Sequence, residues 1–115
     1  MATAKDFVEQ VGQIEGIAGC LLVRKDGSIL GQTVLEPELY SALMIDAGGH
    51  AFDIMSSIGF SYCRHLCFNR ENGCHFYLFP INNYLLGVIQ RTDCDVPRML
   101  DSVYSLVSRV STAAA

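Results

Sequence analysis

Apolar residues recur along the chain in two periods, which separate helical segments from strands. Residues 3–14 and residues 96–110 place apolar side chains at i, i+3, i+4 and i+7, the spacing of one helix face. Short apolar runs lie between these two segments and predict strands. We expect five strands, at residues 17–23, 28–34, 60–69, 74–81 and 84–90.

The segment at residues 38–59 predicts a long helix with too many apolar faces for one core. At about 100° per residue, Asp46, His50, Asp53 and Ser57 fall on one narrow side. Apolar and small residues spread over roughly 200° of the remainder, whereas a helix on a single core needs a stripe of only about 100°. We therefore expect a second surface to bury the rest.

A pair of glycines, Gly48 and Gly49, lies in the middle of this segment. Each costs about 1 kcal/mol relative to Ala inside a helix, so two in a row indicate that another backbone comes close. Our main hypothesis is a helix held between its own sheet and a partner subunit. In the alternative, the glycine pair breaks the segment into two ordinary helices.

The predicted elements follow the order helix, two strands, helix, three strands, helix. Turn signals join neighbouring strands, among them Asp26-Gly27, Asn72-Gly73 and Asn82-Asn83. No repeat or linker divides the chain, so we expect one domain over residues 1–115. A mostly antiparallel five-stranded sheet with helices on its faces, an α+β fold, is the simplest arrangement.

Composition narrows the class of partner. The chain of 115 residues is 50% hydrophobic and only 17% charged, which favours oligomerisation. Its net charge is −4 and its Lys and Arg residues are scattered, so we expect no nucleic-acid partner. No apolar run reaches the length of a membrane span, and the N-terminus lacks a signal-peptide core. Five cysteines, an odd number, fit free thiols in a reducing cytoplasm.

Several stretches together resemble the roadblock family, the dynein light-chain type of small domain. They are the run Ile14-Glu15-Gly16-Ile17-Ala18-Gly19-Cys20-Leu21-Leu22-Val23, the Asp26-Gly27 turn, the long middle helix, the paired hairpins and the closing amphipathic helix. The resemblance covers essentially the whole chain. It implies a profilin-like α/β sandwich, αββαβββα, with strand order 2-1-5-4-3.

The resemblance also implies a function. Members of the family pair as homodimers through the middle helix and the third strand, and they bind small Ras-like GTPases or act as scaffold subunits. Bacterial relatives promote the GTPase's nucleotide turnover without carrying the chemistry themselves. On this basis the expected dimer interface comprises Met44, Gly48, Gly49, Phe52, Met55, Tyr62, Arg64 and Leu66. No residue is assigned to the contact with a GTPase.

Cys63, His65 and Cys67 share one face of the predicted third strand, and Cys74 lies across the following turn. They form the alternative hypothesis, a small ligand-, metal- or redox-sensing domain. Successive same-face positions lie about 7 Å apart, so one tetrahedral zinc ion would struggle to reach three of them. The simpler interpretation is that these thiols are small hydrophobic side chains in a core or an interface.

The remaining polar residues indicate no catalysis. His50 lies one helical turn from Asp46, and an ion pair in solvent explains this spacing. The sequence has no phosphate-binding Gly-x-x-x-x-Gly-Lys-Ser/Thr motif and no nucleophile at a strand-to-helix turn. We therefore expect a protein that is not an enzyme and needs no cofactor.

Overall fold

The computed structural model describes residues 3–60 and 63–114, which form three helices and five strands in the expected αββαβββα order. The elements are α1 (Ala4–Gly12), β1 (Ile17–Arg24), β2 (Ile29–Gln32), α2 (Pro37–Ser57), β3 (Leu66–Phe68), β4 (Phe76–Ile81), β5 (Tyr84–Gln90) and α3 (Val96–Ala114). All neighbouring strands are antiparallel, and the sheet order is β2-β1-β5-β4-β3. This confirms the predicted α+β class and strand order.

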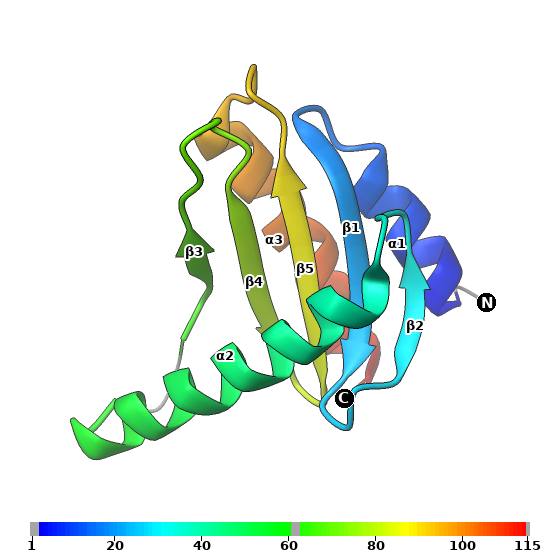
Figure 1. The fold of residues 1–115 in the computed structure, drawn as a ribbon. Helices are drawn as coiled ribbons and strands as arrows, with labels where there is room; N and C mark the ends of the chain where they lie inside the picture. The colour runs from blue at the N-terminus through cyan, green and yellow to red at the C-terminus, as the bar shows by residue number, and fades with distance from the viewer. Residues whose placement is uncertain (1–2, 61–62, 115) are drawn as a thin grey trace.

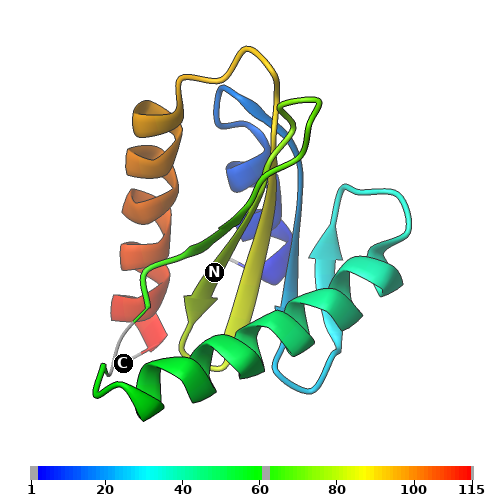
Figure 2. The same ribbon diagram turned by 60° about the vertical axis from the view of Figure 1, so that its left-hand side comes forward.

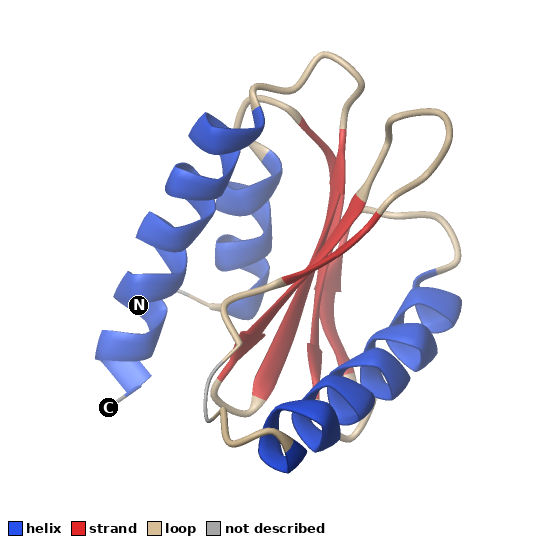
Figure 3. Ribbon diagram, turned by 90° about the vertical axis from the view of Figure 1, so that its left-hand side faces the viewer, coloured by secondary structure: helices blue, strands red, loops and turns tan. Residues whose placement is uncertain are grey.

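The molecule has three layers, with the sheet in the middle (Figures 1 and 2). Helices α1 and α3 cover one face of the sheet, and α2 alone crosses the other face, as Figure 3 shows edge-on. Each face has its own core, because strands covered on both sides bury alternate side chains in opposite directions. Leu22, Phe79 and Val88 face α1 and α3, whereas Leu21 and Leu78 face α2.

Helix α2 is continuous from Pro37 to Ser57, so the alternative in which the glycine pair breaks the helix is wrong. Pro37 begins the helix, where its missing amide donor costs nothing. Glu36 precedes it in the left-handed region at φ 57° and caps no helical amide with its side chain. Within the described chain, no helix is long and apolar enough to cross a membrane.

Strand β3 is shorter than the sequence predicted. The prediction covered residues 60–69, but β3 comprises only Leu66–Phe68. Its ladder pairs Leu66 with Leu78 and Phe68 with Phe76, and the same register would place His65 opposite Phe79 and then Arg64 opposite Pro80. Proline has no amide to donate, so the ladder cannot continue regularly past Pro80. The fourth strand is also shorter at its start, at Phe76 in place of residue 74.

Candidate protein interaction surface

The outer face of α2, which points away from the sheet, changes character along the helix. Its N-terminal half exposes Leu39 and Leu43, with exposed fractions of 55% and 56%. Its middle exposes Asp46 and His50, as the sequence predicted. Farther along, Ile54 continues this face with an exposed fraction of 62%, and Phe52, on another side of the helix, is exposed at 64%. Apolar side chains therefore lie in contact with water at both ends of α2, with a polar section between them.

The first apolar area is a line of three leucines, which we call the leucine stripe: Leu35, Leu39 and Leu43. Leu39 and Leu43 are one helical turn apart and so share a face. Leu35 lies in the loop before α2 and is the most exposed large apolar residue described, at 89%. Scattered exposed leucines are ordinary, but here two share one helix face and the third lies two residues before the helix.

The second apolar area, which we call the seam surface, comprises Gly49, Phe52, Met55 and strand β3. Strand β3 forms the outer edge of the sheet, and among the described strands it pairs only with β4. The C-terminal turns of α2 run beyond this edge (Figure 1). An unpaired edge strand presents amide and carbonyl groups that can pair with another chain.

A cleft of about 750 Å³ opens beneath the C-terminal half of α2. Its lining is mainly apolar and comes from α2, β3, the β4–β5 hairpin and α3, with Met55, Leu66 and Leu85 among the contributors. Lys25 and Asp53 are the charged residues of the lining. Since Gly49, Phe52 and β3 also contribute to it, the cleft is continuous with the seam surface.

The expected interface residues are not all available to a partner. Met44 is only 1% exposed because it packs against the sheet of its own chain, so its assignment to the interface is wrong. A methyl group added at Gly48 would contact Leu85 at 3.5 Å, so this glycine faces the chain's own core. At Gly49 nothing lies within 4 Å of such a group, so this glycine faces outward. Tyr62 lies outside the described residues.

Arg64 and His65 fasten the segment before β3 to helix α3. The Arg64 guanidinium carbon lies 4.1 Å from the centre of the Tyr104 ring, and His65 Nδ1 hydrogen-bonds the Tyr104 hydroxyl. The His65 ring also packs against Tyr77 and Phe79. Burial in this aromatic cluster, together with the positive charge of Arg64, lowers the pKa of His65.

The structure does not gather the candidate thiol ligands. Within the described residues, no group of three His, Cys, Asp or Glu side chains is placed to hold a metal ion. The Cys63 thiol donates to the carbonyl of His65, and the Cys67 thiol donates to the Asn69 side chain. Cys74 is half-buried in the turn before β4, and all three thiols are free.

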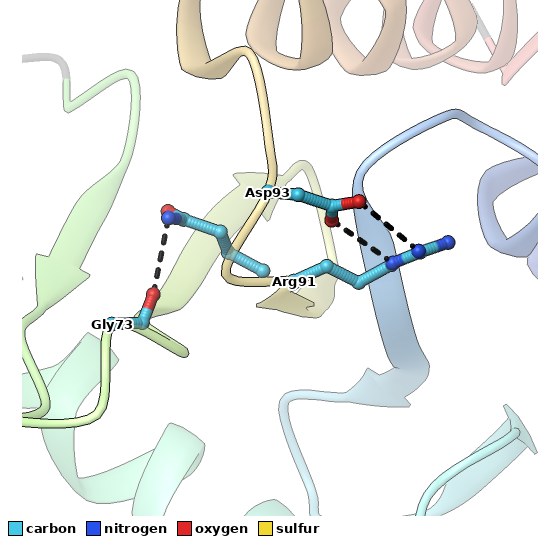
Figure 4. Close-up of polar contacts among 4 residues, drawn as sticks. Gly73, Arg91 and Asp93 are labelled. Atoms are coloured by element: carbon cyan, nitrogen blue, oxygen red, sulfur yellow. Dashed lines mark hydrogen bonds and ion pairs between the residues drawn. The ribbon is translucent and has the colours of Figure 1, made fainter.

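A polar cluster fixes the end of the sheet opposite the cleft. The Tyr77 hydroxyl donates to Gln90 Oε1 at 2.7 Å, and Gln90 Nε2 donates to the carbonyl of Gly73 at 3.1 Å. Burial and the nearby Cys67 thiol raise the pKa of Tyr77 to about 12, so the phenol keeps its proton. Figure 4 shows the hydrogen bond that the Gly73 carbonyl accepts and, apart from it, the exposed ion pair of Arg91 and Asp93. These contacts hold loops in place and form no catalytic arrangement.

Comparison with solved structures gives matches over nearly the whole chain. Myxococcus xanthus MglB superposes with a TM-score of 0.87 at 10% identity, covering 96% of this chain and 93% of that one. A Roadblock/LC7 domain from Streptomyces avermitilis gives 0.73 at 15% identity, covering 92% of each chain. The protein has a roadblock/profilin-like fold. Acanthamoeba castellanii profilin IB also matches this fold, with a TM-score of 0.74 at 10% identity over 98% of this chain and all of that one.

The likeness is clear in structure and faint in sequence. No family model matches this sequence, and no curated protein matches it. The superpositions establish the roadblock/profilin-like arrangement of helices and strands. Because the sequence identities are only 10–15%, they leave the binding properties open.

Sequence reasoning missed the leucine stripe. The apolar residues of this segment were all expected to be buried, yet Leu43 is one turn from Leu39 and close in angle to His50 on the polar side. Leu35 precedes the Glu36-Pro37 helix start, where neither strand nor helix covers it. The sequence did contain a signal for this exposure, because apolar residues recur on the helix face that Asp46 and His50 mark as polar.

Proposed function

We propose that this protein is a non-enzymatic homodimeric adaptor that binds a small Ras-like GTPase and regulates its nucleotide turnover. The observation that carries the proposal is the seam surface, where an unpaired edge strand lies beside an apolar helix end that extends past the sheet. A second copy related by a two-fold axis presents the same surface, so each copy covers the other.

Pairing of the two β3 strands satisfies the backbone groups at both edges and joins the two sheets into one. It also brings the far end of α2 over the partner's cleft, which covers exposed Phe52 and half-buried Met55. A stable interface of ordinary size buries about 800 Å² on each partner. Outward-facing Gly49 then permits close approach of the partner's backbone.

The seam is tested by measuring the mass in solution with light scattering. We expect the wild type to be a dimer and Gly49→Leu to be a monomer, because the added side chain occupies the space of the partner's backbone. Phe52→Ser removes an exposed apolar side chain and should also weaken the dimer. Leu39→Ser is the matched control on the same helix and should remain dimeric. An unchanged dimer in both seam variants would rule out this interface.

The GTPase assignment is supported by the roadblock resemblance and by the likeness to MglB. The test uses purified Ras-like GTPases of the source organism, each loaded with GDP or a non-hydrolysable GTP analogue. We expect one of them to bind this protein in a nucleotide-dependent way and to hydrolyse GTP faster in its presence. If no GTPase binds in either state, the protein has another role.

The cleft gives the sensing alternative a specific basis, since small-molecule sites commonly have volumes of about 300–1,000 Å³. We favour a second copy as its cover because Phe52 and β3 belong to both the cleft and the seam surface. Metal analysis and intact-complex mass spectrometry of untagged protein distinguish the two hypotheses. A stoichiometric metal or small molecule that is lost in a Cys63→Ser, Cys67→Ser variant would favour the sensor.

A further inference from the structure

We propose that the leucine stripe is the surface that binds the GTPase, and that its partner surface is an apolar patch bordered by Lys or Arg side chains. This inference rests on the proposed function. It adds which surface of this chain binds the GTPase and the chemistry of that contact.

The stripe is separate from the seam surface. Leu35 and Leu39 lie at the N-terminal end of α2, whereas Phe52 and β3 lie at or beyond its C-terminal half. Exposed Asp46 and His50 interrupt the apolar character of the outer face between the two areas. The seam surface and the stripe therefore share no residue.

The helix beneath the stripe is held firmly against the sheet. The Tyr40 ring stacks on Phe76 with centroids 5.4 Å apart, and the Ser41 hydroxyl donates to the Gly27 carbonyl at 2.9 Å. Met44, only 1% exposed, is buried on the same side. Leu39 and Leu43 are consequently presented on a rigid support, which lowers the entropic cost of binding.

The loop that carries Leu35 is also constrained. Glu36 adopts φ 57° and ψ 52°, a left-handed conformation that is uncommon for a residue other than glycine. The Glu36 carbonyl accepts a hydrogen bond from the Leu39 amide at 3.1 Å, which ties the loop to the first turn of the helix. A strained backbone that holds an apolar side chain almost entirely in water is consistent with a binding role.

Carboxylates border the stripe. Glu36, Glu38 and Asp46 are all exposed, and the ion pair found among the described residues, Arg91 with Asp93, involves none of them. The guanidinium group of Arg70, a nearby cation, donates a hydrogen bond to the hydroxyl of Tyr40. An apolar centre with an acidic border complements a patch with basic residues at its rim, since rim charges direct association and orientation.

The experiment measures binding of the GTPase that the wild-type protein binds, in its GTP-analogue form, by biolayer interferometry. We expect the double variant Leu39→Ser, Leu43→Ser to bind at least about tenfold more weakly, because it removes two apolar side chains that the partner would bury. Ile58→Ser is the matched control, since Ile58 is 62% exposed near the other end of the same helix, and it should bind like the wild type. Circular dichroism and light scattering should show a folded dimer in each case.

A second variant tests the acidic border. Glu36→Gln, Glu38→Gln and Asp46→Asn together should slow association several-fold and make it less sensitive to salt. Wild-type affinity in the leucine variant, or an unchanged association rate in the charge variant, would overturn the inference while leaving the proposed function intact. Absence of binding by the wild type to every GTPase tested would instead remove the proposed function, and the inference with it.

Discussion

Gly87 lies in β5 at the point where three side chains converge on the α2 face of the sheet. A methyl group at this position would lie 2.8 Å from the Phe76 ring, 2.9 Å from Leu21 Cδ2 and 2.9 Å from Met44 Sδ. These distances are shorter than van der Waals contact, and Met44 belongs to the central part of α2. The absence of a side chain at Gly87 is therefore what lets the α2 side of the sheet pack closely.

We predict that Gly87→Ala lowers the free energy of unfolding by about 1–3 kcal/mol, the usual cost of overpacking a dense core. Urea denaturation followed by circular dichroism measures the change. Gly12→Ala serves as the control, because the nearest atom to its added methyl group is the Cys20 sulfur at an ordinary 3.8 Å. Equal stability of Gly87→Ala and the wild type would show that the side chains under α2 can rearrange to accept the methyl group.

His65 makes stability depend on pH. Its burial against Tyr77, Phe79 and Tyr104, with the charge of Arg64 beside it, lowers its pKa in the folded protein below the ordinary value of 6.5. The unfolded chain therefore binds the proton more readily than the folded chain. Stability is fully present above the unfolded pKa and declines as the pH falls below it towards the folded pKa.

We predict that the wild type loses stability between pH 7 and pH 5, and that His65→Phe loses less over the same range. Phenylalanine keeps the ring packing but has no proton to bind. Urea unfolding at several pH values measures the two slopes, and NMR titration of the His65 ring gives its pKa directly. Identical slopes in the two proteins would show that His65 does not cause the effect.

At the scale of the element, the two halves of α2 differ in what lies beneath them. Its N-terminal half lies over the sheet, where Met44 is buried, while its C-terminal turns extend past β3 and have no sheet of their own chain beneath them. Gly48 and Gly49 lie near this transition. Gly48 rests over Leu85, and Gly49 faces open space.

Gly49→Ala separates stability of the chain from affinity of the dimer. Alanine is favoured over glycine in a helix by about 1 kcal/mol, and nothing in the same chain opposes it. We therefore predict a more stable chain at low protein concentration and a weaker dimer, measured by urea unfolding and by analytical ultracentrifugation. A dimer of unchanged affinity would mean that the partner's backbone does not approach Gly49.

At the scale of the whole molecule, we predict that the two-fold axis of the proposed dimer passes near the middle of β3. Cys67 is the central residue of this strand and is exposed. Antiparallel pairing about that residue places two Cys67 Cα atoms about 4.5–5.5 Å apart, within the range that a disulfide spans.

Oxidation with a small-molecule disulfide, which accepts the two electrons released by the two thiols, should then link two chains covalently. We predict a dimer band on a non-reducing gel that disappears in Cys67→Ser and persists in Cys74→Ser. Peptide mass spectrometry identifies the bond. A link that survives in Cys67→Ser would place the axis elsewhere on the chain.

The order and type of all eight described elements followed from periodicity and turn residues, and the strand order followed from the roadblock resemblance. The errors concern places where one part of the chain limits another. Pro80, in the neighbouring strand β4, limits the length of β3. Met44 is buried by the sheet, and the sequence of the helix does not encode where the sheet lies. The leucine stripe was missed because apolar residues on a helix were assumed to be covered.

The sequence by itself determined that α2 has more apolar surface than one core can cover, because side-chain angles along a helix depend only on residue spacing. Tertiary structure alone decided which of those residues stay in water. Coverage depends on how far the sheet extends beneath the helix and on which edge remains unpaired, and both are set by contacts between segments distant in the chain. The exposed leucines and the open β3 edge are therefore properties of the folded molecule.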